Sequence, residues 1–149
     1  MTITLSIIGA LVIGVAGLLF AQNQKPKITL GLENGQLREI PDTPNCISTQ
    51  TSQSEKLIEA LPLKSSVEAS KAAMLKAFDA YGSIEIIEEK DNYIYAVATS
   101  GKMKFHDDIE IYFDEESGLV QFRSASRAGK SDLGLNKERY DALAEVYNQ

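Results

Sequence analysis

Histidine, cysteine and tryptophan are nearly absent from this sequence of 149 residues, which has one His, one Cys and no Trp. A zinc site needs three or four His or Cys ligands, and an Fe–S cluster needs several thiolates. One His and one Cys are too few for either site within this chain. A single cysteine also excludes an intramolecular disulfide. We therefore expect no metal, no cofactor and a fold stabilised by packing.

Basic residues are also few, since 15 Lys and Arg stand against 21 Asp and Glu, which gives a formal net charge of −6. Neutralising the phosphates of DNA or RNA requires a basic face. The composition therefore argues against a nucleic-acid partner.

A long apolar run stands at the N-terminus, where the nineteen residues Ile3–Ala21 carry no charge. At 1.5 Å per residue this length matches the hydrocarbon core of a bilayer. No Lys or Arg precedes the run, and Leu19 does not suit cleavage after Ala21, so an uncleaved anchor is favoured over a signal peptide. We expect a single-pass membrane protein anchored through residues 3–21, with the membrane face of the domain left open.

The distribution of proline divides the rest of the chain. All four prolines, at positions 26, 41, 44 and 62, fall between Gln22 and Leu63, where neither a helical nor an alternating period persists. We expect a transmembrane anchor over 1–21, a tether over 22–43 and a globular α+β domain over 44–149.

The globular part shows two helical and four strand-like segments. Ser65 and Glu68 form a capping box before a helix at 66–81, Gly82 stops it, and Asn136 is expected to cap a second, C-terminal helix. Between them lie four runs rich in β-branched and aromatic residues, at 83–89, 93–100, 107–114 and 119–126. This pattern predicts a four-stranded antiparallel meander with both helices packed on one face, preceded by the transmembrane helix.

Alternation within the last two strands predicts their register. Ile109, Ile111 and Phe113 would face the core, and the intervening polar side chains would face solvent. A four-residue loop that pairs Asp114 with Leu119 also places Glu110 opposite Arg123.

A basic segment, Arg123–Arg139, stands out in the acidic chain, with five cations against two acids. It runs into a helix N-terminus, where free N–H groups favour an anion. We expect an anion or partner site here, formed by Arg123, Ser124, Ser126, Arg127, Lys130, Ser131, Asp132, Asn136 and Arg139.

A purely structural interpretation of the same segment carries more weight. In it, Asp132 and Asn136 satisfy backbone groups of the loop, and Arg123, Arg127 and Arg139 pair with Asp107, Asp108 and Glu110. Asp107 and Asp108 themselves point to opposite faces of a strand, which argues against a shared metal site.

Two nucleophiles deserve consideration, Cys46 and Ser126. Cys46 would need a base such as His106, which no spacing places beside it, and a buried, inert thiol is the commoner outcome. No catalytic residue is assigned, and an enzyme is the less favoured class.

Three strings, Pro44–Ser48, Asp107–Glu110 and Arg123–Arg139, closely resemble the bacterial and plastid family Domain of Unknown Function 1499. The last has the pattern R-S-A-S-R-x-G-x-S-D-L-G-x-N-x-x-R. The resemblance implies a membrane-associated or exported domain and carries over no activity. It marks motif positions of unknown role at Cys46, Asp107 and Asp108, together with the arginines, serines, Asp132 and Asn136 of the basic segment.

We therefore expect a non-enzymatic binding or scaffolding module whose basic loop engages an anionic ligand or a membrane protein partner. The alternatives are a hydrolase or transferase that uses Cys46 or Ser126, and an accessory subunit of a membrane complex.

Overall fold

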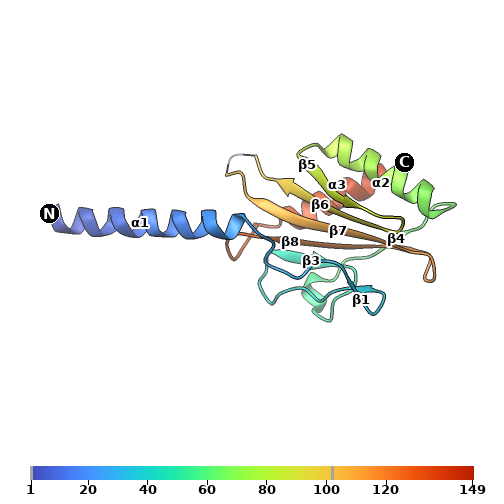
Figure 1. Ribbon diagram of the computed structural model, residues 1–149, viewed down its shortest axis with the longest axis horizontal. Coiled ribbons are helices and arrows are strands. Elements are labelled where there is room, and N and C mark those ends of the chain that lie inside the picture. The colour runs from blue at the N-terminus through green and yellow to red at the C-terminus, as the bar shows by residue number, and fades with distance from the viewer. Residues whose placement is uncertain (1, 102) are drawn as a thin grey trace.

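The computed structural model describes residues 2–101 and 103–149, with side chains from residue 13 onward. A long helix, α1, precedes a sheet domain that carries two further helices (Figure 1). The elements are α1 (Thr2–Asn23), β1 (Leu32–Glu33), β2 (Gln36–Leu37), β3 (Cys46–Ser48), the 3-10 helix η1 (Ser54–Lys56), β4 (Leu61–Pro62), α2 (Val67–Tyr81), β5 (Ile84–Glu89), β6 (Tyr93–Thr99), β7 (His106–Asp114), β8 (Leu119–Ser126) and α3 (Leu135–Tyr147).

The main sheet has six strands, so the prediction of a four-stranded sheet is wrong. The four predicted strands are present as the antiparallel series β5 to β8, and β3 and β4 both pair with the outer edge of β8. These two added strands span three and two residues. Strands this short carry no alternating pattern, and their place comes from the edge of β8 that they cover.

The register of the β7–β8 hairpin is as predicted. Asp114 pairs with Leu119, Ile111 with Phe122, and Glu110 with Arg123. Alternation and loop length therefore sufficed to define this hairpin, because a slip by one residue would turn every apolar side chain to the wrong face.

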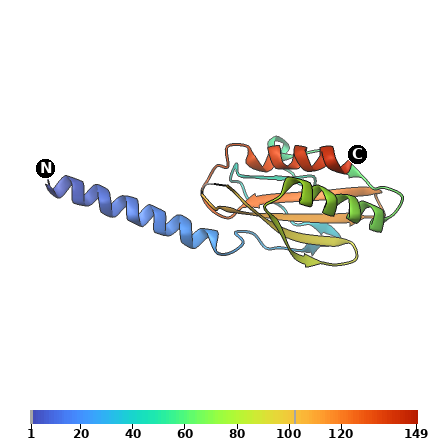
Figure 2. The same cartoon turned by 90° about the horizontal axis from the view of Figure 1, so that it is seen from above.

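Helices α2 and α3 pack on one face of the sheet, seen from two sides in Figures 1 and 2. The apolar core lies between them and the sheet and includes Met74, Phe78, Ile111 and Phe122. The cap of α2 is Ser66, one residue after the predicted Ser65, and its hydroxyl accepts a hydrogen bond from the N–H of Ala69 at 3.1 Å.

The opposite face of the sheet is also covered, contrary to the expectation that it faces solvent. Residues 24–41, which we call the N-terminal cover, cross this face and include the small β1–β2 hairpin. Leu37 from the cover packs with Tyr93, Tyr95 and Val97 of β6. Both faces of the sheet therefore hold buried side chains.

The predicted single-pass membrane anchor is contradicted. Among the residues that the structure describes, no helix is long and apolar enough to cross a membrane. The side chains of residues 1–12, part of the predicted anchor, lie outside the described residues. The helix α1 itself spans Thr2–Asn23. Its last residue, Asn23, is buried against the sheet domain.

Candidate functional site

Three buried ion pairs connect β7 with the basic segment. Arg123 pairs with Glu110, Arg127 with Asp108 at 2.8 Å, and Arg139 with Asp107 at 2.5 Å. The structural interpretation of the segment predicted that these three arginines pair with these three carboxylates, and the register predicted the Arg123–Glu110 pair. The three arginines predicted to bind an anion are therefore already matched by carboxylates of the same chain.

The pairs lie on opposite faces of the sheet. Asp107 points toward the helices and meets Arg139 of α3, whereas Asp108 and Glu110 point toward the N-terminal cover. The predicted separation of Asp107 from Asp108 is thus present. Among the described residues no cluster of His, Cys, Asp and Glu could hold a metal ion.

Asn136 is the centre of the network on the helix face. Its amide nitrogen donates to the carbonyl of Asn45 at 3.1 Å and to the hydroxyl of Ser126 at 3.0 Å, and its amide oxygen accepts from Ser124 and Arg139. It is 1% exposed. Asn136 therefore joins β8, α3 and the start of β3 inside the fold.

Asn136 does not cap α3 as predicted. The cap position is held by Gly134, whose φ of 85° is in the left-handed region, and Asp132 supplies the carboxylate. The oxygens of Asp132 accept from the backbone N–H groups of Gly134 at 3.2 Å and Asn136 at 2.9 Å. The helix N-terminus that was expected to attract an anion is thus already occupied by a carboxylate of the chain.

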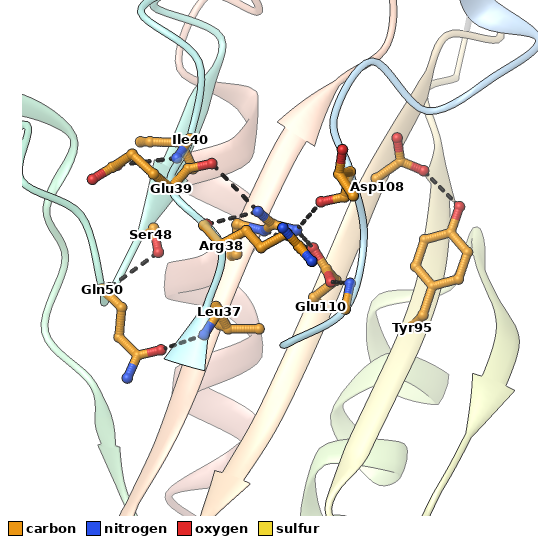
Figure 3. Close-up of polar contacts among 12 residues, drawn as sticks. Leu37, Arg38, Glu39, Ile40, Ser48, Gln50, Tyr95, Asp108 and Glu110 are labelled. Carbon is orange, nitrogen blue, oxygen red and sulfur yellow. Dashed lines mark hydrogen bonds and ion pairs between the residues drawn. The ribbon is translucent and has the colours of Figure 1, made fainter. Parts of the chain in front are cut away.

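Two tyrosines of β6, which the sequence interpretation did not single out, complete the network on the other face. Tyr93 donates to Glu110 at 2.6 Å. Tyr95 donates to Asp108 at 2.7 Å (Figure 3). Burial, together with the bond to Asp108, raises the pKa of Tyr95 to about 12, and burial with Glu110 raises the pKa of Tyr93 further. Both hydroxyls therefore act as neutral donors.

The Arg123–Glu110 pair also holds the N-terminal cover in place. Arg123 donates to the carbonyls of Arg38 at 2.6 Å and Thr29 at 2.9 Å, and Glu110 accepts from the N–H of Gly31 at 2.7 Å. Figure 3 shows Glu110 directed from the sheet toward the part of the cover that contains Arg38. Side chains of the sheet thus form hydrogen bonds with backbone groups of the cover that have no neighbouring strand to pair with.

Cys46 and His106 lie in separate surroundings. The Cys46 thiol, 1% exposed, donates to the carbonyls of Thr43 at 3.0 Å and Pro41 at 3.3 Å, and burial raises its pKa. The His106 ring instead contacts the carbonyl of Asn23 at 3.1 Å. Among the described residues no base contacts Cys46, and burial removes the thiol from solvent, whereas a nucleophilic thiol requires both a base and access.

Asn23 fixes α1 to the start of β7. Its side chain donates to the carbonyl of Lys104 at 2.8 Å and accepts from the N–H of His106 at 2.7 Å. The neighbouring Gln22 accepts from the N–H of Gly129 in the basic segment at 3.3 Å. These contacts bring α1 against the same end of the sheet as the β8–α3 loop.

A cavity of about 160 Å³ lies at this end of the sheet, and we call it the end cavity. Its apolar lining comes from Leu19, Phe105, Ala128 and Leu135. Its other lining residues are Ser100, Asp107, Ser126, Gly129, Ser131 and Asp132. A larger groove of about 660 Å³, between α3 and residues 57–62, contains none of the predicted site residues. Among the described pockets, only the end cavity is lined by several of the predicted site residues.

Two polar groups in the end cavity retain hydrogen-bonding capacity. Within the described part of the chain, Asp107 accepts from Arg139 through Oδ2, while its Oδ1 has no partner. Ser126 accepts from Asn136 and donates no hydrogen bond among the same residues. Asp107 and Ser126 are 2% and 4% exposed and are directly paired across β7 and β8. A ligand group could therefore meet a carboxylate oxygen and a hydroxyl side by side.

The remaining predicted site residues, Ser124 and Lys130, lie outside this cavity. Ser124 is buried under Asn136, and Lys130 is exposed on the loop. The lining contributed by Leu19 and Phe105 had no sequence signal, because both residues belong to apolar or turn segments distant from the motif.

Comparison with known proteins places the chain in a family. The family model described as "Protein of unknown function (DUF1499)" matches residues 36–146. Comparisons with curated proteins and with solved structures give no match. The matched region contains every strand of the main sheet, both α2 and most of α3, and all three buried ion pairs. The chain therefore belongs to the DUF1499 family.

Proposed function

We propose that the chain is a non-enzymatic binding module and that its ligand site is the end cavity. The observation that carries this proposal is the convergence of Asp107, Ser126, Ser131 and Asp132 on one cavity next to the attachment of α1. Small-molecule sites combine apolar walls with a few polar groups that fix orientation, and the end cavity has this composition.

The conformation of the loop beside the cavity supports the proposal. Leu133 is 94% exposed and adopts a φ of 55°, a left-handed conformation that costs a residue other than glycine about 1–3 kcal/mol. Because Leu133 is exposed, burial in the core does not compensate for the cost of its strained backbone. Leu133 lies in the chain between Asp132 and Leu135 of the cavity lining, and its side chain offers an exposed apolar contact for a binding partner.

The internal pairing of the three arginines limits which residues can contact a ligand. Arg123, Arg127 and Arg139 are engaged in internal pairs, so the proposal assigns them to the frame of the site rather than to ligand contact. A buried cation that loses its carboxylate partner is strongly destabilised, which makes exchange of these partners for a free anion unfavourable.

A screen of small molecules against the full chain tests this function. Thermal unfolding would be followed with amines, alcohols, carboxylates and phosphates, because a compound that binds the native state raises its stability. The matched variant is Ala128→Leu, which adds three carbons at the wall of the end cavity. Compounds that stabilise the wild type but not Ala128→Leu support the proposal. It fails if no compound stabilises the wild type, or if every stabilising compound acts equally on Ala128→Leu.

A hydrolase or transferase remains the second candidate, because the Ser126 hydroxyl lines the same cavity beside Asp107. In that case a compound from the screen would be converted rather than only bound. Product formation by the wild type that is lost in Ser126→Ala, with binding retained, would favour the enzyme over the binding module.

A further inference from the structure

We propose that the end cavity binds an aliphatic primary amine in its protonated form. This inference rests on the proposed function and assigns the chemical class of its ligand. It is drawn from three properties of the described lining: its charge, its unused acceptors and its size.

The charge of the lining favours a cation. The end cavity is lined by two carboxylates, of which Asp107 is matched by Arg139. Asp132 accepts hydrogen bonds from backbone and amide N–H groups and has no cationic partner among the described residues. The half-buried Asp132 thus leaves one negative charge of the lining without a counter-ion among the described residues, and this charge attracts a cation.

The unused acceptors fit an ammonium group. An ammonium has three donors and no acceptor. Asp107 Oδ1 has no partner among the described residues. The hydroxyls of Ser126 and Ser131 in the same lining accept from Asn136 and from the N–H of Leu133, and each oxygen keeps a second lone pair. Three oxygens of this kind can satisfy three N–H groups, whereas a carboxylate or phosphate ligand would meet Asp107 and Asp132 with like charge.

The size and walls of the cavity fit a short alkyl chain. A volume of about 160 Å³ corresponds to roughly five water molecules at about 30 Å³ each, which is small for a binding site. Leu19, Phe105, Ala128 and Leu135 provide the apolar surface for the methylene groups. Four aliphatic carbons and an ammonium make up both n-butylamine and the side chain of a lysine, so a free amine and a partner's lysine present the same chemistry.

Titration of the full, isotopically labelled chain at pH 7 tests the inference. The backbone amide signals of residues 126–135 would be followed with n-butylamine, n-butanol and butyrate. The amine is almost fully protonated at this pH, since an alkylamine has a pKa near that of lysine, about 10.4. We expect saturable shifts with n-butylamine, at least tenfold weaker binding of n-butanol, and no binding of butyrate. Equal affinity for the amine and the alcohol, or no saturation by the amine, would overturn the inference.

Matched variants locate the binding. Asp107→Asn should weaken n-butylamine binding at least tenfold, whereas Asp108→Asn should change it less than twofold, because Asp108 has a similar ion pair on the opposite face. Ala128→Leu should abolish binding while leaving the Asp107–Arg139 pair intact, and it covers the case in which Asp107→Asn does not fold. Equal effects of Asp107→Asn and Asp108→Asn, or full binding by Ala128→Leu, would contradict the inference.

Two further results decide two further questions. One is whether the ligand is a free amine or a lysine side chain, and the other is whether the binding module stands if the amine inference fails. Binding of N-acetyl-lysine amide as tight as that of n-butylamine supports a lysine side chain as ligand, and binding of n-butylamine alone supports a free amine. If instead a neutral or anionic compound binds and is blocked by Ala128→Leu, the binding module stands and the amine inference is wrong.

Discussion

Replacement of Arg123 by methionine should release the N-terminal cover and destabilise the whole domain. The substitution leaves the Glu110 carboxylate, 1% exposed, with only the hydroxyl of Tyr93 and the N–H of Gly31. It also removes the donors of three carbonyls in the cover, those of Thr29, Arg38 and Glu39. Loss of one partner from a buried ion pair costs about 3–5 kcal/mol. A single domain has about 5–15 kcal/mol in total, so the variant should be folded but much less stable.

Urea unfolding followed by circular dichroism measures this loss, and a double variant tests its cause. In Arg123→Met with Glu110→Leu the buried carboxylate is also removed, so we expect most of the lost stability to return. Arg38→Met is the matched control, since Arg38 forms an exposed pair with Glu33 and its loss should cost less than about 1 kcal/mol. Limited trypsin digestion should cut Arg123→Met within the cover, at Lys27 or Arg38, before the wild type.

Two outcomes would refute the reasoning about the cover. A loss below about 1 kcal/mol in Arg123→Met would mean that the ion pair does not hold the cover in place. A double variant whose loss equals the sum of the two single losses would mean that Arg123 and Glu110 are not energetically coupled.

Three further predictions concern a helix cap, a surface carboxylate and the cysteine. Asp132→Ala should lower the free energy of unfolding by about 1 kcal/mol because α3 loses its cap, and an unchanged thermal midpoint would contradict this. Burial raises the pKa of Glu39, but hydrogen bonds, first that of Thr51, outweigh it and lower the pKa to about 2. The stabilisation by Glu39 is therefore complete above about pH 4.5 and lost as the pH falls through 2, so the stability difference between wild type and Glu39→Gln should shrink in this range; a constant difference would argue against it. Cys46 should react with a thiol reagent only after unfolding, and rapid labelling of the native chain would disprove its burial.

The hairpin and the ion pairs could be predicted because their signals are local. The alternation of Ile109, Ile111 and Phe113 and the length of the turn defined the register, and the register placed Glu110 opposite Arg123. Arg127 lies just after β8 and Arg139 lies on α3, so the register alone did not assign their carboxylate partners. Their pairing was expected only from the number of arginines and carboxylates in these segments.

The N-terminal cover and the end cavity could not be predicted, because neither depends on a local sequence signal. The cover is held mainly through backbone groups, such as the carbonyl of Thr29 and the N–H of Gly31, which every sequence contains. The end cavity combines Leu19 with Phe105 and residues of the motif, and only the tertiary structure brings these segments together. The error about α3 had a different cause, because Asp132 and Asn136 are both good capping residues and the left-handed turn at Gly134 selected the former.

The attachment of the N-terminal cover has a consequence for the order in which the chain can fold during synthesis. The hydrogen bonds that join the cover and the end of α1 to residues 104–129 connect residues 79 to 107 positions apart, from Gly31 with Glu110 to Gln22 with Gly129. Residues 24–41 leave the ribosome well before their partners on β7 and β8, because β7 begins only at His106. The apolar residues of this segment, Leu30, Leu37 and Ile40, therefore wait for most of the time of synthesis without the face that they will cover. The N-terminal cover can therefore bind to the sheet only after β7 and β8 have been made. A ribosome pause before β8 would leave the cover exposed to other partners.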